Sequence, residues 1–552
     1  MRRVSAASGS RMLTALGTAG WMLLMSGFAS AGDFGVTEEN ERYTVDTGAG
    51  LVFRVLRSNG DIDSIRWKGM ELRGRKTSHI ASGLGSKGTM VELSRKDDMA
   101  VITLKTDSTN GVVEDLTHYY IVRKGENTIY MATHAEKQPR VGELRWIARL
   151  KREPFSRIPE PSDVAGNTGA VESQDVFRMP DRTTRSKYYG NQQAKDLSIR
   201  GVGGEGIGAF IVYGNRESSS GGPFFRDIQN QSGSELEVYN YMNSGHLQTE
   251  PRRSGVLYGP YALCFTDGSA PEYPDMDFVS KLNLKGMVPS DQRGAVHVED
   301  IDGMDERFPY MVAFSNADAQ YWAEVRKGEA MCEGMKPGKY EMVIFKGELV
   351  VHRDEIVVSA KGTLVIPSIR IDEDPSTDEP VWRIGDWDGT PLEFRNGSKL
   401  SLMHPSDPRM EDWMEDNFTV GEDKAANFPA CQWAKVNGSR EIHFKLSADQ
   451  LKAHTIRIGI TTAHSGGRPK IHVNDWSARN PGPSSQPQSR GMTIGSYRGN
   501  NVTYRFDVPA EAFVEGINTV TIWPISGQQA RDFLSPGYAF DCLDMLPAGT
   551  AN

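Results

Sequence analysis

Apolar and polar residues alternate with a period of two along most of the chain, a pattern that predicts β-strands. Leu51 to Arg57 alternates in this way, as does Ile62 to Trp67, and Asn59-Gly60 stands between them. Because Asn-Gly supplies the positive φ angles of a type I′ turn, this segment is predicted to be a β-hairpin. Such strands recur to about Ser290, with hardly any amphipathic helix. The pattern therefore predicts an all-β protein.

Residues 291–372 show shorter strands with regular turns. Pro337-Gly338-Lys339 leads into an alternating segment from Tyr340 to Phe345. Lys346-Gly347-Glu348 then forms a turn before Leu349 to Ser359. Short strands joined by regular turns are typical of a small immunoglobulin-like or fibronectin type III-like sandwich.

An acidic run with two prolines, Asp372 to Pro380, separates this part from the rest of the chain. Like charges repel and proline denies regular pairing, so the run predicts a solvated linker, with a calcium site as the alternative. Val381 to Asn552 is again strand-like, with a loop at Gly482 to Pro487 and a late strand at Ile517 to Pro524. A jelly roll is the simplest architecture for this part. The chain of 552 residues is thus predicted to hold three domains, 32–290, 291–372 and 379–552.

The first 31 residues have the pattern of a cleavable signal peptide. Arg2, Arg3 and Arg11 precede an apolar stretch from Leu13 to Phe28, and Ala29-Ser30-Ala31 matches a cleavage site. The apolar stretch is interrupted too early for a membrane anchor, which needs about 20 residues. We expect a secreted or periplasmic protein. Cleavage would remove three arginines from a chain of net charge −9, so the mature protein would be still more acidic. An acidic substrate must therefore be held by a local basic cluster. For the same reason, nucleic acid is not an expected partner.

Several familiar sites are excluded. Cys264, Cys332, Cys431 and Cys542 are too far apart for zinc or redox spacing and are predicted to be buried free thiols. The chain has no Gly-x-Ser-x-Gly, His-Glu-x-x-His or Cys-x-x-Cys motif. Gly201-x-Gly203-x-x-Gly206 precedes a strand-like segment instead of opening a helix, so it does not predict a nucleotide site.

Three segments contain candidate residues for substrate binding or catalysis. In Gly142 to Lys151, strand alternation places Arg145 and Arg149 on one face, about 13 Å apart at roughly 3.3 Å per residue. Such cations suit an anionic chain, although a solvated face is the plainer alternative. Thr184 to Gly190 is a second cationic segment with aromatic residues.

Val238 to Glu250 is the third segment, in which Tyr239 and Tyr241 are predicted to point the same way. Aromatic faces beside amides and hydroxyls suit sugar rings. Paired tyrosines are also common as half-buried packing, and a lone histidine such as His246 is usually structural.

Together these segments resemble the rhamnogalacturonan lyases of polysaccharide lyase family 4. The matching stretches follow one another in order and span the first predicted domain: Phe34 to Thr37, Val45 to Leu51, Ser58 to Ile62, Ser78 to Ser86, Gly142 to Leu150, Thr184 to Tyr189, Glu217 to Asp227 and Met242 to Glu250. Ile384 to Pro391 and His404 to Asp407 look like that family's third domain. The resemblance implies a large sandwich of galactose-mutarotase type, a fibronectin type III-like sandwich and a carbohydrate-binding-like jelly roll.

The resemblance also implies roles for individual residues. Lys187 is similar to the family's catalytic lysine and His246 to its catalytic histidine. Arg145 and Arg149 resemble its substrate-binding arginines, and Tyr239 and Tyr241 the aromatic residues of its cleft. These enzymes cleave the bond between rhamnose and galacturonate by β-elimination. An uncharged Lys187 would remove the C5 proton, an arginine would neutralise the carboxylate, and His246 would protonate the leaving oxygen or orient the uronate.

The sequence leaves two alternative functions open. A non-catalytic pectin-binding protein on the same scaffold would bind without producing an unsaturated uronate, and a glycoside hydrolase would need two carboxylates flanking the bond. Trp382 or Trp387 are candidates for sugar binding in the third domain, with core packing as the alternative. No cofactor is expected for the chemistry, a structural calcium ion is an open alternative, and the chain is expected to act as a monomer on rhamnogalacturonan I.

Overall fold

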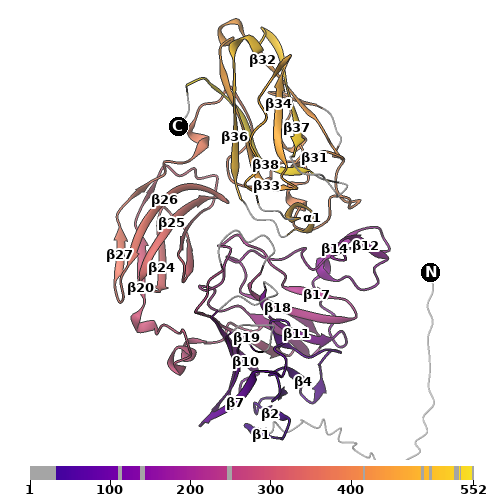
Figure 1. Ribbon diagram of the computed structural model, residues 1–552, viewed down its shortest axis with the longest axis vertical. Helices are drawn as coiled ribbons and strands as arrows, with labels where there is room; N and C mark the ends of the chain where they lie inside the picture. The colour runs from indigo at the N-terminus through magenta and orange to yellow at the C-terminus, as the bar shows by residue number, and fades with distance from the viewer. Residues whose placement is uncertain are drawn as a thin grey trace, which may run out of the picture.

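The computed structural model describes residues 33–107, 109, 115–136, 143–244, 252–413, 417–486, 490–495, 500–526, 534 and 536–549. Nearly all regular structure in these ranges is β-strand, and the one α-helix there is the short α1 (Gly491–Ile494). Figure 1 shows three β units, the first in indigo to magenta, the second in salmon and the third in orange to yellow. The all-β prediction is confirmed. The predicted signal peptide lies outside the described residues.

The first unit contains four antiparallel sheets. The five-stranded sheet consists of β1 (Gly35–Glu38), β2 (Arg42–Asp46), β3 (Leu51–Leu56), β4 (Ile62–Trp67) and β5 (Met70–Glu71). The seven-stranded sheet has the order β15 (Ile199–Gly204), β16 (Ile207–Val212), β19 (Val256–Thr266), β10 (Thr128–Ala135), β9 (Leu116–Arg123), β8 (Met99–Thr106) and β7 (Thr89–Lys96). The four-stranded sheet has the order β17 (Asn230–Ser232), β18 (Glu235–Asn243), β11 (Leu144–Lys151) and β6 (His79–Ile80). The small sheet is β12 (Gly169–Glu172), β13 (Val176–Arg178) and β14 (Thr184–Ser186).

Sequence alternation accounts for how these strands pack. In β3, the side chains of Leu51, Phe53 and Val55 are buried, and the residues between them are half-buried. The predicted hairpin between β3 and β4 is confirmed, but the prediction of a two-residue type I′ turn between them is wrong. A register shift in β3 lengthens the loop, and Gly60 takes a positive φ of 77° while the side chain of Asn59 accepts a hydrogen bond from the amide of Asp61.

The second unit is a sandwich, as the strand and turn pattern predicts. One sheet has the order β23 (Gln320–Glu324), β22 (Tyr310–Ser315), β25 (Gly338–Lys346) and β26 (Leu349–Val358). The facing sheet has the order β24 (Ala330–Met335), β20 (Gly294–Val298) and β27 (Thr363–Ile366), and β21 (Ile301–Asp302) pairs with β28 (Ile369–Arg370). The predicted turn at residues 346–348 does join β25 to β26.

The third unit is also a two-sheet sandwich. One sheet has the order β29 (Trp382–Gly385), β38 (Gly537–Pro547), β33 (His454–His464) and β36 (Val502–Val508), with β31 (Cys431–Trp433) also paired to β38. The other has the order β30 (Phe418–Thr419), β32 (Arg440–Leu446), β37 (Gly516–Ile525), β34 (Arg468–Val473) and β35 (Trp476–Ser477).

All four cysteines are buried and free, as predicted. Within the described ranges, no helix has the length and apolar character needed to cross a bilayer.

The acidic run after the second unit is only partly solvated, so the prediction of a solvated linker is wrong for its buried and ion-paired residues. Asp374 is buried and accepts a hydrogen bond of 2.9 Å from the amine of Lys346, which is itself fully buried. Asp378 pairs with Arg457 of the third unit at 2.6 Å. The carboxylates are therefore held by cations on the flanking units, which the local sequence does not reveal.

Replacing Asp374 by alanine is expected to destabilise the protein by about 3–5 kcal/mol, because it leaves the ammonium of Lys346 buried without its counter-ion. The control is Asp372→Ala, which removes an exposed partner of His352 and should cost about 1 kcal/mol or less. Urea unfolding of both variants measures the difference. Equal midpoints for the two variants would contradict the assignment.

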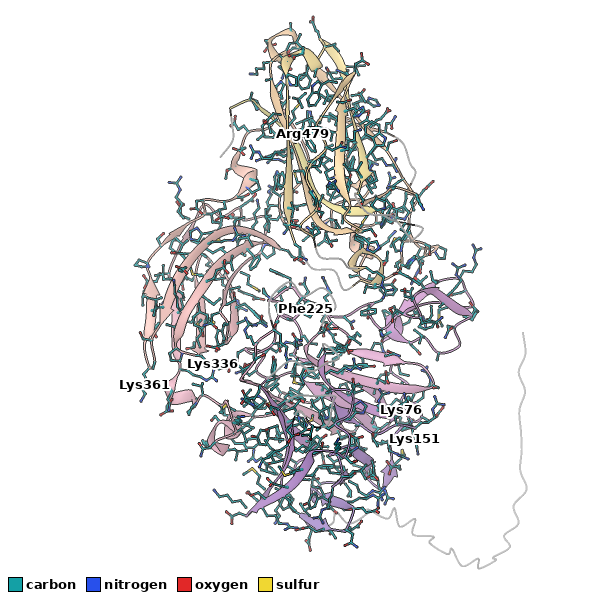
Figure 2. The ribbon with its side chains drawn as sticks, viewed as in Figure 1. Lys76, Lys151, Phe225, Lys336, Lys361 and Arg479 are labelled. Carbon is teal, nitrogen blue, oxygen red and sulfur yellow. The ribbon has the colours of Figure 1, made fainter. Side chains whose placement is uncertain are left out.

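The first and second units meet around the buried carboxylate of Glu217. It accepts two hydrogen bonds from Arg293, at 2.6 and 3.1 Å, and one of 2.6 Å from the hydroxyl of Tyr321, while the amine of Lys336 lies 3.1 Å away. Burial alone would raise the pKa of Glu217, but these partners outweigh it and lower the pKa to about 2. Phe225 is buried and lies where the three units approach one another (Figure 2).

Because the folded-state pKa of Glu217 is depressed, its stabilising effect is present above its ordinary pKa of 4.5 and is lost as the pH falls toward about 2. In Glu217→Gln, the melting temperature should be lower at neutral pH and should change less across this window than in the parent. Melting curves between pH 7 and pH 2 test this. Glu324→Gln, at an exposed ion pair with Arg326, is the control and should follow the parent; the same steep decline in Glu217→Gln would contradict the role of Glu217.

Candidate active site

The candidate site lies on one face of the β17-β18-β11-β6 sheet. In β11, the side chains of Trp146, Ala148 and Leu150 are buried in the main core of the first unit. Arg145, Ile147 and Arg149 alternate with them and so lie on the opposite face. Strand alternation predicted this arrangement, and the structure confirms it.

Both arginines already have carboxylate partners on this face. Arg149 lies opposite Glu237 of β18 in the strand register and pairs with it, and Glu235 is 3.6 Å away. Arg145 pairs with Glu143 and donates a hydrogen bond of 3.0 Å to the hydroxyl of Tyr241. The side chain of Arg145 is 20% exposed and that of Arg149 is 11% exposed. Arg145 is therefore the more accessible of the two guanidinium groups.

Tyr239 and Tyr241 stand side by side on the same face, as predicted. Their ring centroids are 5.5 Å apart, and the guanidinium of Arg145 lies 5.5 Å from the centroid of the Tyr241 ring. Burial raises the pKa of Tyr241, and the negative charge of Asp227 adds to this effect. The phenol of Tyr241 thus stays protonated, as a hydrogen-bond donor, across the physiological pH range.

Lys187 comes from the segment that follows β14. It reaches the sheet face that carries Arg145, Tyr239 and Tyr241, here called the wall. Its amine lies 5.3 Å from the centroid of the Tyr188 ring. Tyr188 belongs to an apolar cluster with Ile147, Tyr239 and Tyr241. The side chain of Lys187 is 26% exposed, so its amine is accessible from solvent beside the strand that carries Arg145. The structure thus places Lys187 beside the aromatic cluster that contains the predicted tyrosines.

The partner of Lys187 is a carboxylate, which the sequence did not indicate. Asp175 lies 3.1 Å from the amine of Lys187, and its other oxygen accepts a hydrogen bond of 2.6 Å from Arg490. Arg490 stands just before α1 in the third unit and also donates to Glu172 at 2.9 Å. Burial alone would raise the pKa of Asp175, but Arg490 and Lys187 outweigh it and lower that pKa. Asp175 is therefore ionised and shared by two cations.

The third unit also fixes the strand that carries this segment. The carboxylate of Asp407 accepts hydrogen bonds of 2.6 Å from both the amide and the hydroxyl of Thr184, the first residue of β14. Tyr189 donates a hydrogen bond of 2.6 Å to the carbonyl of Thr493 in α1. Figure 1 shows α1 at the end of the third unit, next to β12 and β14. The position of Lys187 therefore depends on two units of the chain.

His79 is a further polar group on this face. In β6 it lies opposite Ile147 in the register, so its side chain shares the face of Arg145 and Arg149. Burial, together with the positive charges of Arg149 and Arg145, lowers the pKa of His79 to about 4. Its Nδ1 is 3.1 Å from the carbonyl oxygen of Thr77, which only accepts, so Nδ1 carries the proton. His79 is thus a neutral imidazole with Nε2 as a hydrogen-bond acceptor.

His246 lies outside the described residues, so its catalytic role stays a prediction. The strand β18, which carries both tyrosines, ends at Asn243. Among the described residues, no group of three or more histidine, cysteine or acidic side chains is arranged to hold a metal ion.

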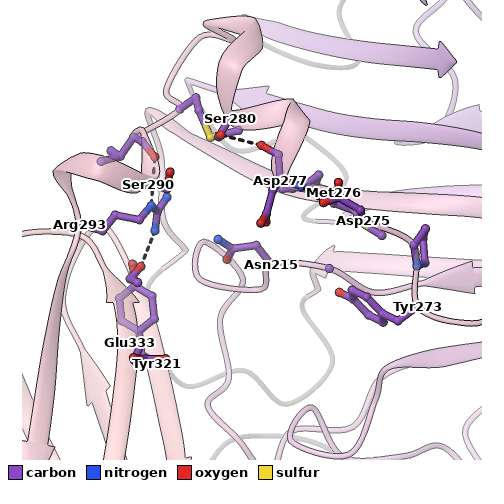
Figure 3. Close-up of a pocket in the computed structure, with 16 residues that line it drawn as sticks. Asn215, Tyr273, Asp275, Met276, Asp277, Ser280, Ser290, Arg293, Tyr321 and Glu333 are labelled. Carbon is purple, nitrogen blue, oxygen red and sulfur yellow. Dashed lines mark hydrogen bonds between the residues drawn. The ribbon is translucent and has the colours of Figure 1, made fainter.

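A hollow of about 680 Å³ lies elsewhere, at the junction of the first and second units. Figure 3 shows Asn215 and Asp277 in the middle of its lining, with Tyr273 on one side and Arg293 on the other. The guanidinium of Arg293 is engaged by Glu217 and the carbonyl of Gly334. Since the predicted site residues are absent from its described lining, this hollow is separate from the candidate active site.

No local sequence pattern marks Asp175 or Arg490 as members of the site. They are 315 positions apart along the chain, and each is an ordinary charged residue in its own segment. His79 lies within a stretch that resembles the family, but nothing in its local pattern assigned it a role. Contacts between the first and third units bring these groups together, and a pattern of local periodicity does not encode them.

Guanidinium groups, adjacent tyrosines and an accessible amine along one sheet define a site suited to an acidic sugar chain. Three family models match this chain. "Rhamnogalacturonan lyase B, N-terminal" matches residues 34–286, and "Polysaccharide lyase family 4, domain II" and "domain III" match residues 292–365 and 380–545.

Curated relatives match along nearly the whole chain. Two proteins named "Probable rhamnogalacturonate lyase A", from Aspergillus flavus and Aspergillus clavatus, are each 40% identical over 93% of this chain and 96% of their own length. "Rhamnogalacturonate lyase A" of Emericella nidulans is 38% identical over the same shares of the two chains. The chain therefore belongs to polysaccharide lyase family 4, among the rhamnogalacturonan lyases.

Proposed function

We propose that this protein cleaves the bond between rhamnose and galacturonate in the backbone of rhamnogalacturonan I by β-elimination. The supporting observation is the accessible amine of Lys187 on the same wall as Arg145, Tyr239 and Tyr241. Such a wall offers one group that can accept a proton and others that bind an anionic sugar. Family membership supports the same reaction.

In the proposed reaction, the uncharged amine of Lys187 takes the proton from C5 of the galacturonate. The C5–H electron pair forms the double bond between C4 and C5, and the bond from C4 to the rhamnose oxygen breaks. The leaving oxygen takes up a proton, which His246 is proposed to supply. No water is added, so one product ends in a 4,5-unsaturated galacturonate.

The uronate carboxylate must be neutralised, because an ionised carboxylate makes the C5 proton poorly acidic. Arg145 is better placed for this than Arg149, since it is more exposed and Arg149 is engaged by Glu237 and Glu235. A guanidinium binds a carboxylate through two parallel hydrogen bonds. Substrate binding at Arg145 therefore requires the uronate to compete with Glu143 for the guanidinium.

Asp175 opposes the proposed base role, because an adjacent carboxylate favours the charged amine. Arg490 limits this effect by sharing the carboxylate and by adding a positive charge on the far side of it. An alkaline-leaning optimum is expected.

Incubation with purified rhamnogalacturonan I and, separately, with homogalacturonan tests the proposal. Ultraviolet absorbance of the unsaturated uronate should rise with rhamnogalacturonan I and not with homogalacturonan. Activity on homogalacturonan alone would overturn the substrate assignment. Tight binding without any rise in absorbance would favour a non-catalytic pectin-binding protein.

The remaining proposals concern the whole chain. We propose export with cleavage after Ala31, action as a monomer, and domain limits at residues 32–290, 291–372 and 379–552. N-terminal sequencing of the secreted protein and its mass in solution test the first two. Limited proteolysis tests the third.

A further inference from the structure

One face of the third unit has an unusual outward row of side chains. In β34 and β37, the inward residues Ile471, Val473, Val520 and Ile522 are fully buried in the core. Alternate residues of a strand point to opposite faces. The outward positions of the two strands must therefore be Arg468, Lys470 and His472 in β34 and Thr519, Thr521 and Trp523 in β37.

The strand register brings the aromatic ring and the basic side chains together. Trp523 lies directly opposite Lys470, and Thr521 lies opposite His472. The rings of His472 and Trp523 touch, with centroids 4.5 Å apart and an angle of 62° between their planes. On the next strand, the hydroxyl of Ser477 is 3.4 Å from Nε2 of His472. The indole is therefore held in place while it remains partly exposed.

The amine of Lys470 is available to a ligand. Across the residues that the structure places, no carboxylate lies within ion-pair distance of it. Arg468, about 7 Å along the same face, donates hydrogen bonds within the described ranges only to backbone carbonyls, those of Pro481 and Gly466. Two cations with no carboxylate partner in the described part of the chain thus stand in a row beside an indole, on a chain whose net charge is −9.

The two tryptophans that were candidates for sugar binding in this unit do not have such a position. Trp382 and Trp387 are 5% and 1% exposed, and the indole of Trp387 donates a hydrogen bond of 3.0 Å to the buried Asp544. Of the two alternatives left open by the sequence, core packing is confirmed and sugar binding is wrong, because both residues are part of the interior. The alternation of β37 instead turns Trp523 toward solvent.

We propose that Trp523, Lys470 and Arg468 form a binding site for a uronate-containing polysaccharide chain, separate from the candidate active site. The indole offers an apolar face to the C–H side of a sugar ring. Lys470 and Arg468 pair with carboxylates, and Thr521 and His472 offer hydrogen bonds to hydroxyl groups. The site goes beyond the proposed cleavage, because it holds the polymer without acting on it.

Binding is best measured on the full chain with Lys187→Ala present in every variant, so that polymer is not cut during the measurement. Isothermal titration with polygalacturonate should show affinity about tenfold weaker when Trp523→Ala is added, and near-parent affinity with Trp523→Phe. Lys470→Gln should weaken binding about threefold and reduce its dependence on salt. Neutral galactan should bind at least tenfold more weakly than polygalacturonate.

Ile517→Ala is the matched control, because Ile517 is 65% exposed and lies on the same face of β37, away from Trp523. It should leave the affinity unchanged. Unaltered binding in Trp523→Ala, with the fold verified by its melting temperature, would overturn the site. Equal binding of galactan and polygalacturonate would overturn the uronate assignment. Neither outcome depends on whether the protein cleaves rhamnogalacturonan.

Discussion

Replacement of Lys187 by alanine is expected to lower the turnover of rhamnogalacturonan I by about a thousandfold or more, because no other described group on the wall is positioned as its amine is. Loss of a general base typically costs a factor of about 10²–10⁴. The fold should survive, since the side chain is partly exposed and Asp175 keeps its ion pair with Arg490. Initial rates from enoate absorbance, with melting temperatures for both proteins, provide the measurement.

Lys195→Ala is the matched control for this prediction. The side chain of Lys195 has the same 26% exposure, and its amine also pairs with a carboxylate, that of Asp196, at 2.9 Å. Lys195→Ala should retain the parent rate. A Lys187→Ala protein with near-parent activity would remove Lys187 from the role of base.

Arg490→Gln and Asp175→Asn are expected to move the pH dependence of kcat/KM in opposite directions. Without Arg490, Asp175 stabilises the charged amine of Lys187 more strongly, so the acid limb of the profile should move up by about one pH unit. At pH values below this limb, the rate should fall about tenfold. Without the carboxylate of Asp175, the amine loses its proton more easily, and the limb should move to lower pH.

The direction of each shift separates an electrostatic role from a merely structural one. Loosened packing between the first and third units would lower the rate at every pH without moving the limb. Arg479→Gln removes an exposed arginine of the same third unit (Figure 2) and should leave the profile unchanged. Shifts of the same sign in Arg490→Gln and Asp175→Asn would contradict the proposed balance at Lys187.

The sequence was most informative where period-two alternation decides which way a side chain points. Arg145 and Arg149 were predicted to share a face, as were Tyr239 and Tyr241, and both pairs do. Burial of one face fixes the register of a strand, so the other face is determined as well. The same reasoning predicted the late strand that carries Trp523.

Interactions between distant segments could not be predicted in this way. Asp374 looked like part of a solvated linker, but the buried amine of Lys346 binds it. Trp387 stood in a stretch of polar residues and turned out to be interior. Asp175 and Arg490 meet only because the third unit docks on β12 and β14. In each case the partner lies far away in sequence, and the energy of the contact depends on burial that the local pattern does not contain.

The central claim, elimination without addition of water, is tested most directly by the masses of the products formed from a defined rhamnogalacturonan I oligosaccharide. We predict that the masses of the two fragments sum to that of the parent, and that the fragment with galacturonate at its non-reducing end absorbs in the ultraviolet. Fragments whose summed mass exceeds that of the parent by one water, without ultraviolet absorbance, would show hydrolysis and contradict this account.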